Sequence, residues 1–334
     1  MLKRWLLSCV AILFTALFGV MGGEFCLQMD SSLNNRETVY FEISKGQGVK
    51  AIADGLYVNG LINHPFWFRL FAWKENAATK LKFGEYEIPP ATTSRQLLAL
   101  FASGKVRHYS LTLVEGWTFK QMAEAMKQQP NLVHLIDGKP PAEVMGLIDA
   151  PGEQAEGRFY PDTYFFSKGT SDIEVLKRAY HKMQTVLADE WQARGQDLLL
   201  HNPYETLILA SIVEKETGLA EERNKIAGVF SRRLSKKMLL QTDPSVIYGM
   251  GESYTGNIRK EDLLRDTPFN SYVHLGLPPT PICMPGIGSI RAVLHPDAES
   301  SLYFVARGDG GHVFSDNLTD HNKAVNQFQK KRHE

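Results

Sequence analysis

A run without charged residues extends from Trp5 to Gly23, directly after Lys3 and Arg4. As a helix it would be about 28 Å long, close to the roughly 30 Å of a bilayer core. A cleaved signal peptide is the alternative, but "GVMGGEF" is a poor cleavage site, and "LLSC" lacks the preceding apolar run of a lipoprotein signal. We predict a transmembrane helix over residues 5–23, with residues 1–4 in the cytoplasm and everything after it outside.

The composition limits the classes of ligand that such an exported chain is expected to bind. Lys and Arg number 37, as do Asp and Glu, so the formal net charge is zero and gives no general attraction to nucleic acid. The ten His and three Cys show no C-x-x-C or H-E-x-x-H spacing, so we predict neither a metal site nor a disulfide framework. A domain outside the cytoplasm has no reliable supply of NADH or ATP, and no cofactor is expected. Glycans remain open as ligands.

Strand and helix signals alternate after residue 38, which indicates an α+β fold. The polar residues 24–38 read as a stalk. Strand, glycine turn and helix then follow over 39–60, and "GEYEIPPATTSRQLLALFASGK" and "YSLTLVEGWTFKQMAEAMKQQ" echo that order. These segments are either weak internal repeats or similar by chance, as strand–turn–helix segments of any α+β domain can be. Residues 39–104 loosely resemble a LysM-type peptidoglycan-binding module.

A second, mixed α+β domain is predicted over residues 105–330. It contains an aromatic cluster, "EGRFYPDTYFF", and a long helix between Ser171 and Gly195. Further helices are predicted over 204–217 and 220–237. Residues 239–312 are rich in Gly, Pro, Asn, Asp and Tyr, as is typical of loops that carry binding sites.

The helix over 204–217 carries two carboxylates, Glu214 and Glu216, about 160° apart on a helical wheel. Glu216 falls between Ile212 and Leu209 in the apolar sector, whereas Glu214 lies nearer its edge. An unpaired carboxyl in apolar surroundings keeps its proton toward neutral pH, as a general acid for glycoside cleavage requires. The alternative is structural: Glu216 closes the helix by pairing with a basic group, and Glu214 is solvated.

The loops after this helix supply groups suited to a sugar groove. Aromatic faces, amides and acids occur beside proline turns, and sugars offer both hydroxyls and apolar ring faces. Each such residue taken alone is more often a turn or packing residue, so the prediction depends on their concentration. The loop residues in question are Gln241, Asp243, Tyr248, Asn270, Tyr272, Pro278 and His312.

With these residues identified, the chain resembles the MltG (YceG-like) family of endolytic murein transglycosylases. The matching motifs are "EG-F-PDTY", "ASIVEKET", "LQTDP-VIYG", "N-Y---GLPP-PI--PG" and "YFVA-GDGGH-F", between residues 156 and 314. The family's catalytic acid maps onto Glu216, and Glu216-Thr217 also resembles the Glu-Ser pair of other lytic transglycosylases. Departures from the family pattern are Ser245, Thr280 and Met284.

The resemblance implies a membrane-anchored enzyme that cleaves the β-1,4 bond between N-acetylmuramic acid and N-acetylglucosamine in nascent peptidoglycan. Glu216 would act first as acid and then as base, giving 1,6-anhydro ends without consuming water. The resemblance also implies the inner (cytoplasmic) membrane, a periplasmic catalytic domain and peptidoglycan synthases as partners. The predicted substrate contacts are Glu156, Asp162, Thr217, Gln241, Asp243, Tyr248, Asn270, Tyr272, Pro278 and His312.

Two other functions stay open from the residues alone. A hydrolase of the same glycan would need a second carboxylate, for which Asp243 and Glu156 are candidates. A non-catalytic peptidoglycan-binding protein would use the LysM-like part alone.

Overall fold

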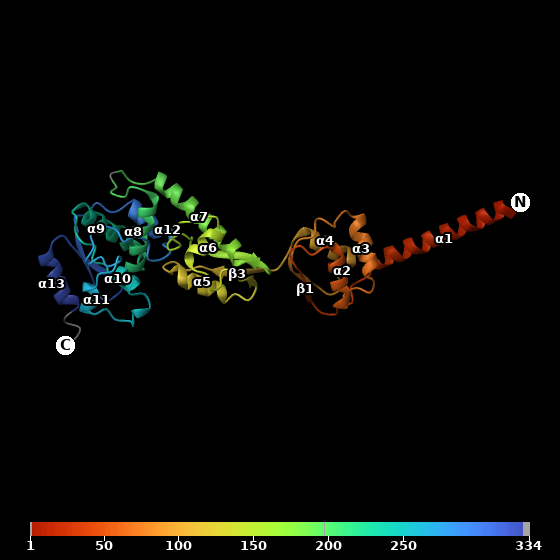
Figure 1. Ribbon diagram of the computed structural model, residues 1–334, viewed down its shortest axis with the longest axis horizontal. Coiled ribbons are helices and arrows are strands. Elements are labelled where there is room, and N and C mark those ends of the chain that lie inside the picture. The colour runs from red at the N-terminus through yellow and green to blue at the C-terminus, as the bar shows by residue number, and fades with distance from the viewer. Residues whose placement is uncertain (1, 197, 330–334) are drawn as a thin grey trace. The chain divides into compact units, whose positions relative to one another are not determined.

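The computed structural model describes residues 2–196 and 198–329. They divide into two compact units (Figure 1). Unit 1 contains the residues up to 109 together with 165–170, and unit 2 contains 110–164 and the residues from 171 onward. The mixture of helices and short antiparallel strand pairs agrees with the predicted α+β class.

Unit 1 is built around one antiparallel strand pair with helices between and after the strands. Strand β1 pairs with β2 over five residues, Val39 opposite Ile88 and Ile43 opposite Gly84. The elements are α1 (Leu2–Asp30), β1 (Val39–Ile43), α2 (Val49–Val58), α3 (Pro65–Lys74), β2 (Gly84–Ile88) and α4 (Ser94–Ser103).

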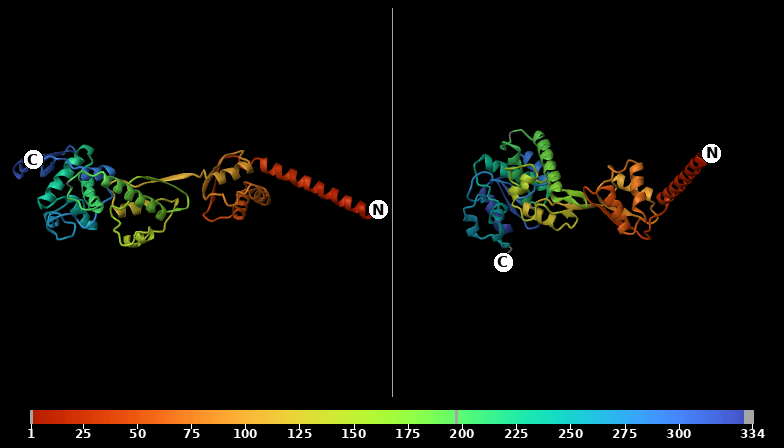
Figure 2. Two further views of the ribbon diagram at one scale, coloured as in Figure 1. Left: turned by 90° about the horizontal axis from the view of Figure 1, so that it is seen from above. Right: turned by 45° about the vertical axis from the view of Figure 1, so that its right-hand side comes forward.

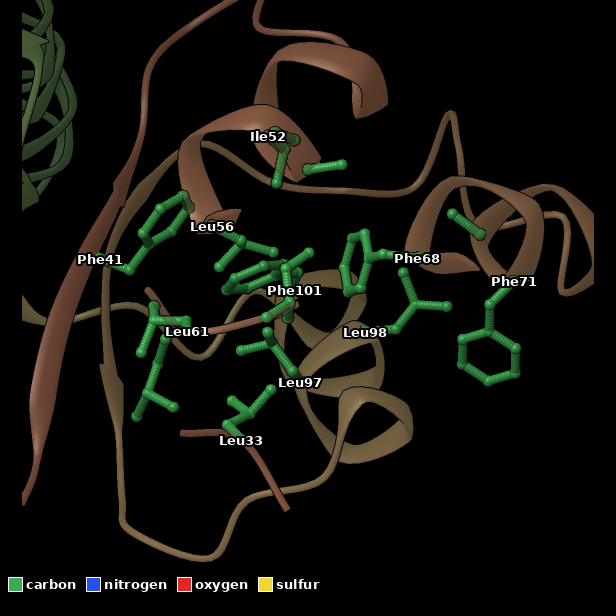
Figure 3. Close-up of a cluster of buried hydrophobic side chains, with 14 of the residues drawn as sticks. Leu33, Phe41, Ile52, Leu56, Leu61, Phe68, Phe71, Leu97, Leu98 and Phe101 are labelled. Carbon is green, nitrogen blue, oxygen red and sulfur yellow. The ribbon is translucent and has the colours of Figure 1, made fainter. Parts of the chain in front are cut away.

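Aromatic side chains fill the core of unit 1. Figure 3 shows Phe41, Phe68 and Phe101 converging with the leucines of α2 and α4. The rings of Phe41 and Phe101 stack at 5.8 Å between centroids, and Tyr86 lies 4.7 Å from Phe101. This core holds the two strands and the three helices α2, α3 and α4 together.

The first helix differs from the sequence prediction. Helix α1 does not stop at Gly23 but continues through Glu24 to Asp30, and Met29 is buried in the core of unit 1. Within residues 2–196 and 198–329, no helix is both long and apolar enough to cross a membrane. This finding contradicts the membrane-spanning helix predicted over residues 5–23 and the single-pass inner-membrane location that was predicted with it.

Unit 2 is mainly helical, with short strand pairs at its edges. Strand β3 pairs with β5, β4 with β6, and β7 with β8, and β3, β5 and β6 include the chain positions at which the two units divide. The elements before the central helices are β3 (His108–Thr112), α5 (Phe119–Lys127), β4 (Leu132–Val133), α6 (Pro141–Leu147), β5 (Thr163–Ser167), β6 (Thr170–Ser171) and α7 (Asp172–Gln192). The later elements are α8 (Pro203–Glu216), η1 (Ala220–Glu222), α9 (Arg223–Ser235), α10 (Asp243–Met250), η2 (Gly251–Ser253), α11 (Lys260–Leu264), α12 (Ile287–Leu294), β7 (Tyr303–Ala306), β8 (His312–Ser315) and α13 (Leu318–Phe328).

Helix α8 is the centre of the apolar core of unit 2. It packs against α9 and α12, and α7 lies along the outside of this group (Figures 1 and 2). Residues 206–213 of α8 are all buried, so the helix has no solvent face along this stretch. The hairpin of β7 and β8 packs on α13, and β7 also contacts α9. These contacts position the C-terminal end of α8 beside the hairpin and the start of α10.

Candidate active site

Helix α8 ends at Glu216, the carboxylate singled out by the helical wheel. The Asn202 side chain accepts a hydrogen bond from the Glu205 N–H, and Pro203 occupies the first turn, so the helix start is fixed by an N-cap and a proline. Thr217 leaves the helix in an extended conformation. Glu216 therefore sits on the last turn of a rigid, buried helix, where its side chain reaches the loop that precedes α10.

The Glu216 carboxyl is hydrogen-bonded by a threonine of that loop. Its Oε1 accepts a hydrogen bond from Thr242 Oγ1 at 2.5 Å. The backbone of Thr242 is itself held: its N–H donates to Ser271 Oγ at 2.9 Å, and its carbonyl accepts from Ser245 Oγ at 2.9 Å. Because Thr242, Ser245 and Ser271 are all buried, the hydroxyl that meets Glu216 has little freedom to move.

Glu216 lines a cavity of about 450 Å³ between α8, α9, the start of α10, the β7–β8 hairpin and α13. Five of the eleven residues that the sequence proposed for catalysis or binding meet there. These five are Glu216, Gln241, Asp243, Tyr272 and His312. The other lining residues are Arg233, Leu240, Tyr303, Phe304, Val305, Ala306, Leu318, His321, Val325 and Gln329.

The surroundings of Glu216 favour its protonated form. Burial is the main cause that raises its pKa to about 7, and the nearby negative charge of Asp243 adds to the rise. The Thr242 hydrogen bond and the positive charge of Arg233 act in the opposite direction but do not cancel it. A large fraction of Glu216 therefore carries a proton near neutral pH while the side chain still borders a cavity.

Arg233 gives the cavity wall a fixed positive charge. Its guanidinium donates to the carbonyls of Leu302 and Leu240, both at 2.7 Å, and lies 5.2 Å from the centre of the Tyr303 ring. Burial lowers the pKa of Arg233, although a guanidinium stays charged at any physiological pH. This charge can stabilise the carboxylate form of Glu216 after its proton has been given away.

The cavity lining also contains a tyrosine and an acid that are in contact. Tyr272 donates its hydroxyl proton to Asp243 Oδ1 at 2.6 Å. The neighbouring Gln241 has a φ of 50°, in the left-handed region that non-glycine residues rarely occupy. Its N–H donates to the Ser271 carbonyl at 3.1 Å, which holds this conformation. Such backbone strain is common where side chains are aimed at a ligand.

Glu156 and Tyr248 lie elsewhere in unit 2 and do not line the cavity. Glu156 is buried, where it accepts hydrogen bonds from the Phe119 N–H at 2.9 Å and the Tyr248 hydroxyl at 3.0 Å. Burial raises its pKa to about 7 despite these hydrogen bonds. The contact ties the start of α5 to α10, so the visible role of this pair is to fix the helix that begins beside Glu216.

Three other predicted residues also lie away from the cavity. Asn270 uses its side-chain amide to bond the carbonyls of residues 262, 263 and 265, which shapes the loop that carries Tyr272. Asp162 pairs with Lys182, and Pro278 lines a separate cavity beside α8.

Thr217 is buried directly after Glu216, where its hydroxyl accepts from the Leu219 N–H at 3.0 Å. This hydrogen bond shapes the turn that follows α8, directly after Glu216. The family departures Ser245, Thr280 and Met284 are also absent from the described lining residues of the cavity.

Glu214 points to a different partner. Its Oε2 accepts from the Gly286 N–H at 3.0 Å and from Ser289 Oγ at 2.7 Å, and its Oε1 lies 3.9 Å from an Arg223 nitrogen. The side chain is only 7% exposed. The wheel had placed Glu214 nearer the edge of the apolar sector, and the structural alternative had made it solvated. Glu214 caps the start of α12 and holds it on α8.

Some residues that line or border the site were not predicted from the sequence. They are Thr242, Arg233, Tyr303 and His321. Thr242 lies between Gln241 and Asp243 in "LQTDP", so the motif contained it. Arg233 lies in the basic stretch "SRRLSKK", which reads as a solvated helix end. Within the part of the chain that is described, no group of three or more His, Cys, Asp or Glu side chains is arranged to hold a metal ion.

Comparison with known proteins places this arrangement in a family. The model of the YceG-like family matches residues 41–327. The endolytic murein transglycosylase of Bacillus subtilis (strain 168) is 28% identical over 336 residues, which cover 94% of this chain and 92% of that protein. The endolytic murein transglycosylase of Streptococcus pneumoniae serotype 2 (strain D39 / NCTC 7466) is 28% identical over 353 residues, with 94% of this chain and 63% of that protein covered.

A solved structure supports the same assignment. The crystal structure of a YceG-like protein from Listeria monocytogenes is 31% identical in sequence and superposes with a TM-score of 0.55. The match covers 86% of this chain and 99% of that one. The chain therefore belongs to the YceG-like family.

Proposed function

We propose that this YceG-like protein is an endolytic murein transglycosylase. It would cleave the β-1,4 bond between N-acetylmuramic acid and N-acetylglucosamine within nascent peptidoglycan strands, without consuming water. Support comes from the names of the relatives in Bacillus subtilis and Streptococcus pneumoniae and from the motifs shared with the family. Peptidoglycan synthases are proposed as partners on the family resemblance.

The observation that carries the proposal is the placement of Glu216. A carboxyl that borders a cavity and holds its proton near pH 7 has the property that a general acid needs. We assign to Glu216 the protonation of the glycosidic oxygen as the bond to C1 of the muramoyl residue breaks. The carboxylate left behind is stabilised by the Thr242 hydroxyl and faces the charge of Arg233.

In the second half of the reaction the same carboxylate would act as a base. It takes the proton of the muramoyl C6 hydroxyl while that oxygen attacks C1, which closes the 1,6-anhydro ring and restores the protonated acid. Bonds and protons balance without water, metal or cofactor. One carboxyl thus suffices, provided that its pKa lies near the working pH so that both proton transfers are accessible.

A hydrolase of the same glycan is the second candidate, because Asp243 lines the cavity that contains Glu216. Asp243 could activate a water molecule while Glu216 protonates the leaving oxygen. Its Oδ1 already accepts from Tyr272, which leaves the other oxygen for a water. Glu156, the other candidate for a second carboxylate, does not line the cavity.

We further propose that the LysM-like region, residues 39–104, helps to hold glycan and contributes no chemistry. Its buried acid is Glu85, and burial alone would raise the pKa of this group. The Tyr109 hydroxyl at 2.5 Å, together with Lys168 and Arg107, instead keeps that pKa below its usual value. Glu85 therefore stays ionised and paired, and is unsuited to donate a proton.

The products distinguish these functions. Purified full-length protein is incubated with isolated glycan strands in heavy-oxygen water, and the new ends are analysed by mass spectrometry. A transglycosylase gives 1,6-anhydro ends free of the heavy isotope. A hydrolase gives reducing ends that are heavier by one water and contain the isotope, and a binding protein gives no new ends.

A further inference from the structure

The Glu222 carboxylate contacts two groups of His312, the backbone N–H and the ring Nδ1. Its Oε1 accepts from the backbone N–H of His312 at 2.9 Å, and its Oε2 lies 2.6 Å from the ring Nδ1. Both side chains are about one-tenth exposed, so water does not compete strongly for this contact. His312 lines the cavity of Glu216, whereas Glu222 lies behind it at the end of η1.

This contact determines which ring nitrogen carries the proton. An ionised carboxylate can only accept hydrogen bonds, so Nδ1 must be the donor in the 2.6 Å contact. In the neutral imidazole the proton then sits on Nδ1, and Nε2 is an acceptor. Because Nδ1 is taken by Glu222, Nε2 is the ring nitrogen left for the cavity.

The backbone of the β7–β8 hairpin leaves room for the Glu222 carboxylate beside His312. A Cβ on Gly311 would lie 3.2 Å from Glu222 Oε1 and 2.3 Å from the Arg307 guanidinium, so a side chain there would push on both. The Phe304 ring meets the His312 ring edge-on, at 5.4 Å and 88°, and limits its rotation. The carboxylate, the glycine and the aromatic ring together fix the imidazole in one orientation.

We propose that Glu222 is a positioning residue that sets the tautomer and orientation of His312, so that Nε2 accepts a hydrogen bond from a sugar hydroxyl of the bound glycan. The ligand in this statement depends on the proposed function, but the tautomer does not. A fixed acceptor on the hairpin would hold the sugar ring against Glu216 across the cavity. The predicted binding residue His312 thus depends on a second residue, Glu222, that does not line the cavity.

The tautomer can be measured directly. Long-range proton–nitrogen correlation spectra of full-length protein with labelled histidine distinguish the protonated ring nitrogen from the unprotonated one. His312→Gln identifies the signals by their loss. We expect Nδ1 of His312 to be protonated in the wild type. In Glu222→Gln the new amide donates to Nδ1, which moves the proton to Nε2 and converts the acceptor into a donor.

The Glu222→Gln variant should bind the glycan less well while the protein stays folded. The carbonyl oxygen of the introduced amide can still accept from the His312 N–H. We expect kcat/KM for glycan strands to fall roughly tenfold, the value of about one hydrogen bond. The loss should appear mainly in KM, because the acid Glu216 is untouched. The double variant with His312→Gln should be no worse than His312→Gln alone, since both changes remove one interaction.

A matched control is Asp266→Asn, which alters an exposed His–carboxylate contact, His274 Nε2 to Asp266 Oδ1 at 2.6 Å, away from the cavity. It should leave kcat/KM unchanged. The proposal is overturned if wild-type His312 is protonated on Nε2, if the proton moves in Glu222→Gln without a change in KM, or if the two variants are additive. Wild-type protein that forms neither anhydro nor reducing ends from glycan strands would instead overturn the proposed function and the glycan as ligand, and the tautomer measurement tells these failures apart.

Discussion

The Glu216 carboxyl and the Thr242 hydroxyl meet at 2.5 Å, although 26 residues separate them in the chain. Glu216 ends α8 and Thr242 precedes α10, so the contact joins two elements whose ends border the same cavity. A hydrogen bond to the carboxylate lowers the pKa that burial raises, and the balance leaves a value of about 7. The pH dependence of activity and of stability follows from this balance.

Activity should fall as the pH rises through about 7, because the proposed acid must be protonated before the glycosidic bond breaks. Above that pH the logarithm of the initial rate should decrease by about one per pH unit. Anhydro-end formation measured from about pH 5 to about pH 9 checks this. Glu156→Gln is the control, because Glu156 also has a pKa of about 7 but lies outside the cavity. A fall that disappears in that variant would assign the titration to Glu156.

Thr242→Val should slow the reaction and move its pH dependence. The variant removes the hydroxyl that stabilises the carboxylate form, so the pKa of Glu216 rises and the fall in rate shifts to higher pH. A hydrogen bond to a charged group is worth about 1.5–3 kcal/mol, which corresponds to a roughly 10- to 100-fold lower rate. Thr185→Val, which removes an exposed hydroxyl on α7, is the matched control. An unchanged pH profile in Thr242→Val would refute a role for this contact.

Glu216→Gln should gain stability over the wild type as the pH rises. The folded-state pKa of about 7 exceeds the ordinary 4.5, so the wild type loses stability between these two values while the neutral variant does not. Denaturant unfolding at about pH 5 and about pH 8 should show the difference changing by roughly 2.5 kcal/mol in favour of the variant at the higher pH. A difference independent of pH would mean that Glu216 titrates normally and is not desolvated.

The sequence predicted the helix over 204–217 and the separation of its two acids, because helical periodicity is a local property. The structure has this helix at Pro203–Glu216, with Glu214 and Glu216 serving different partners. The burial of Glu214 was not predictable, since the face that it occupies is covered by α12, about 75 residues later in the chain. A single helical wheel cannot show which faces other elements cover.

Tertiary contacts also decide which of the predicted binding residues reach the cavity. Gln241, Asp243, Tyr272 and His312 reach the cavity, whereas Glu156, Asp162, Asn270 and Pro278 do not. Turn-forming and binding residues have the same chemistry, and only tertiary contacts separate them, as the three carbonyl contacts of Asn270 illustrate. Arg233 was not predicted from the sequence, because it lies among basic residues of a kind that is mostly exposed, whereas its guanidinium is buried on backbone carbonyls.

The prediction for residues 5–23 also placed the end of the helix wrongly, because it took the end of the uncharged run as the end of the helix. Helix α1 continues past that run through Glu24 to Asp30. Its last residues belong to the core of unit 1, where Met29 is 1% exposed. The end of the apolar run therefore did not mark the end of the helix.

The variants Glu216→Gln and Glu214→Gln together decide whether Glu216 is the acid and base of the reaction. Both variants remove one acid from the same helix, and neither changes the size of the side chain. Glu214→Gln weakens the cap of α12 and should cost about 1–3 kcal/mol of stability. The measurement is the yield of anhydro-muropeptides from isolated glycan strands at a temperature where thermal melting shows both variants to be folded. We expect Glu216→Gln to lower this yield at least ~100-fold and Glu214→Gln to keep most of it. An active Glu216→Gln protein beside an inactive but folded Glu214→Gln protein would contradict the assignment of Glu216 as the acid and base.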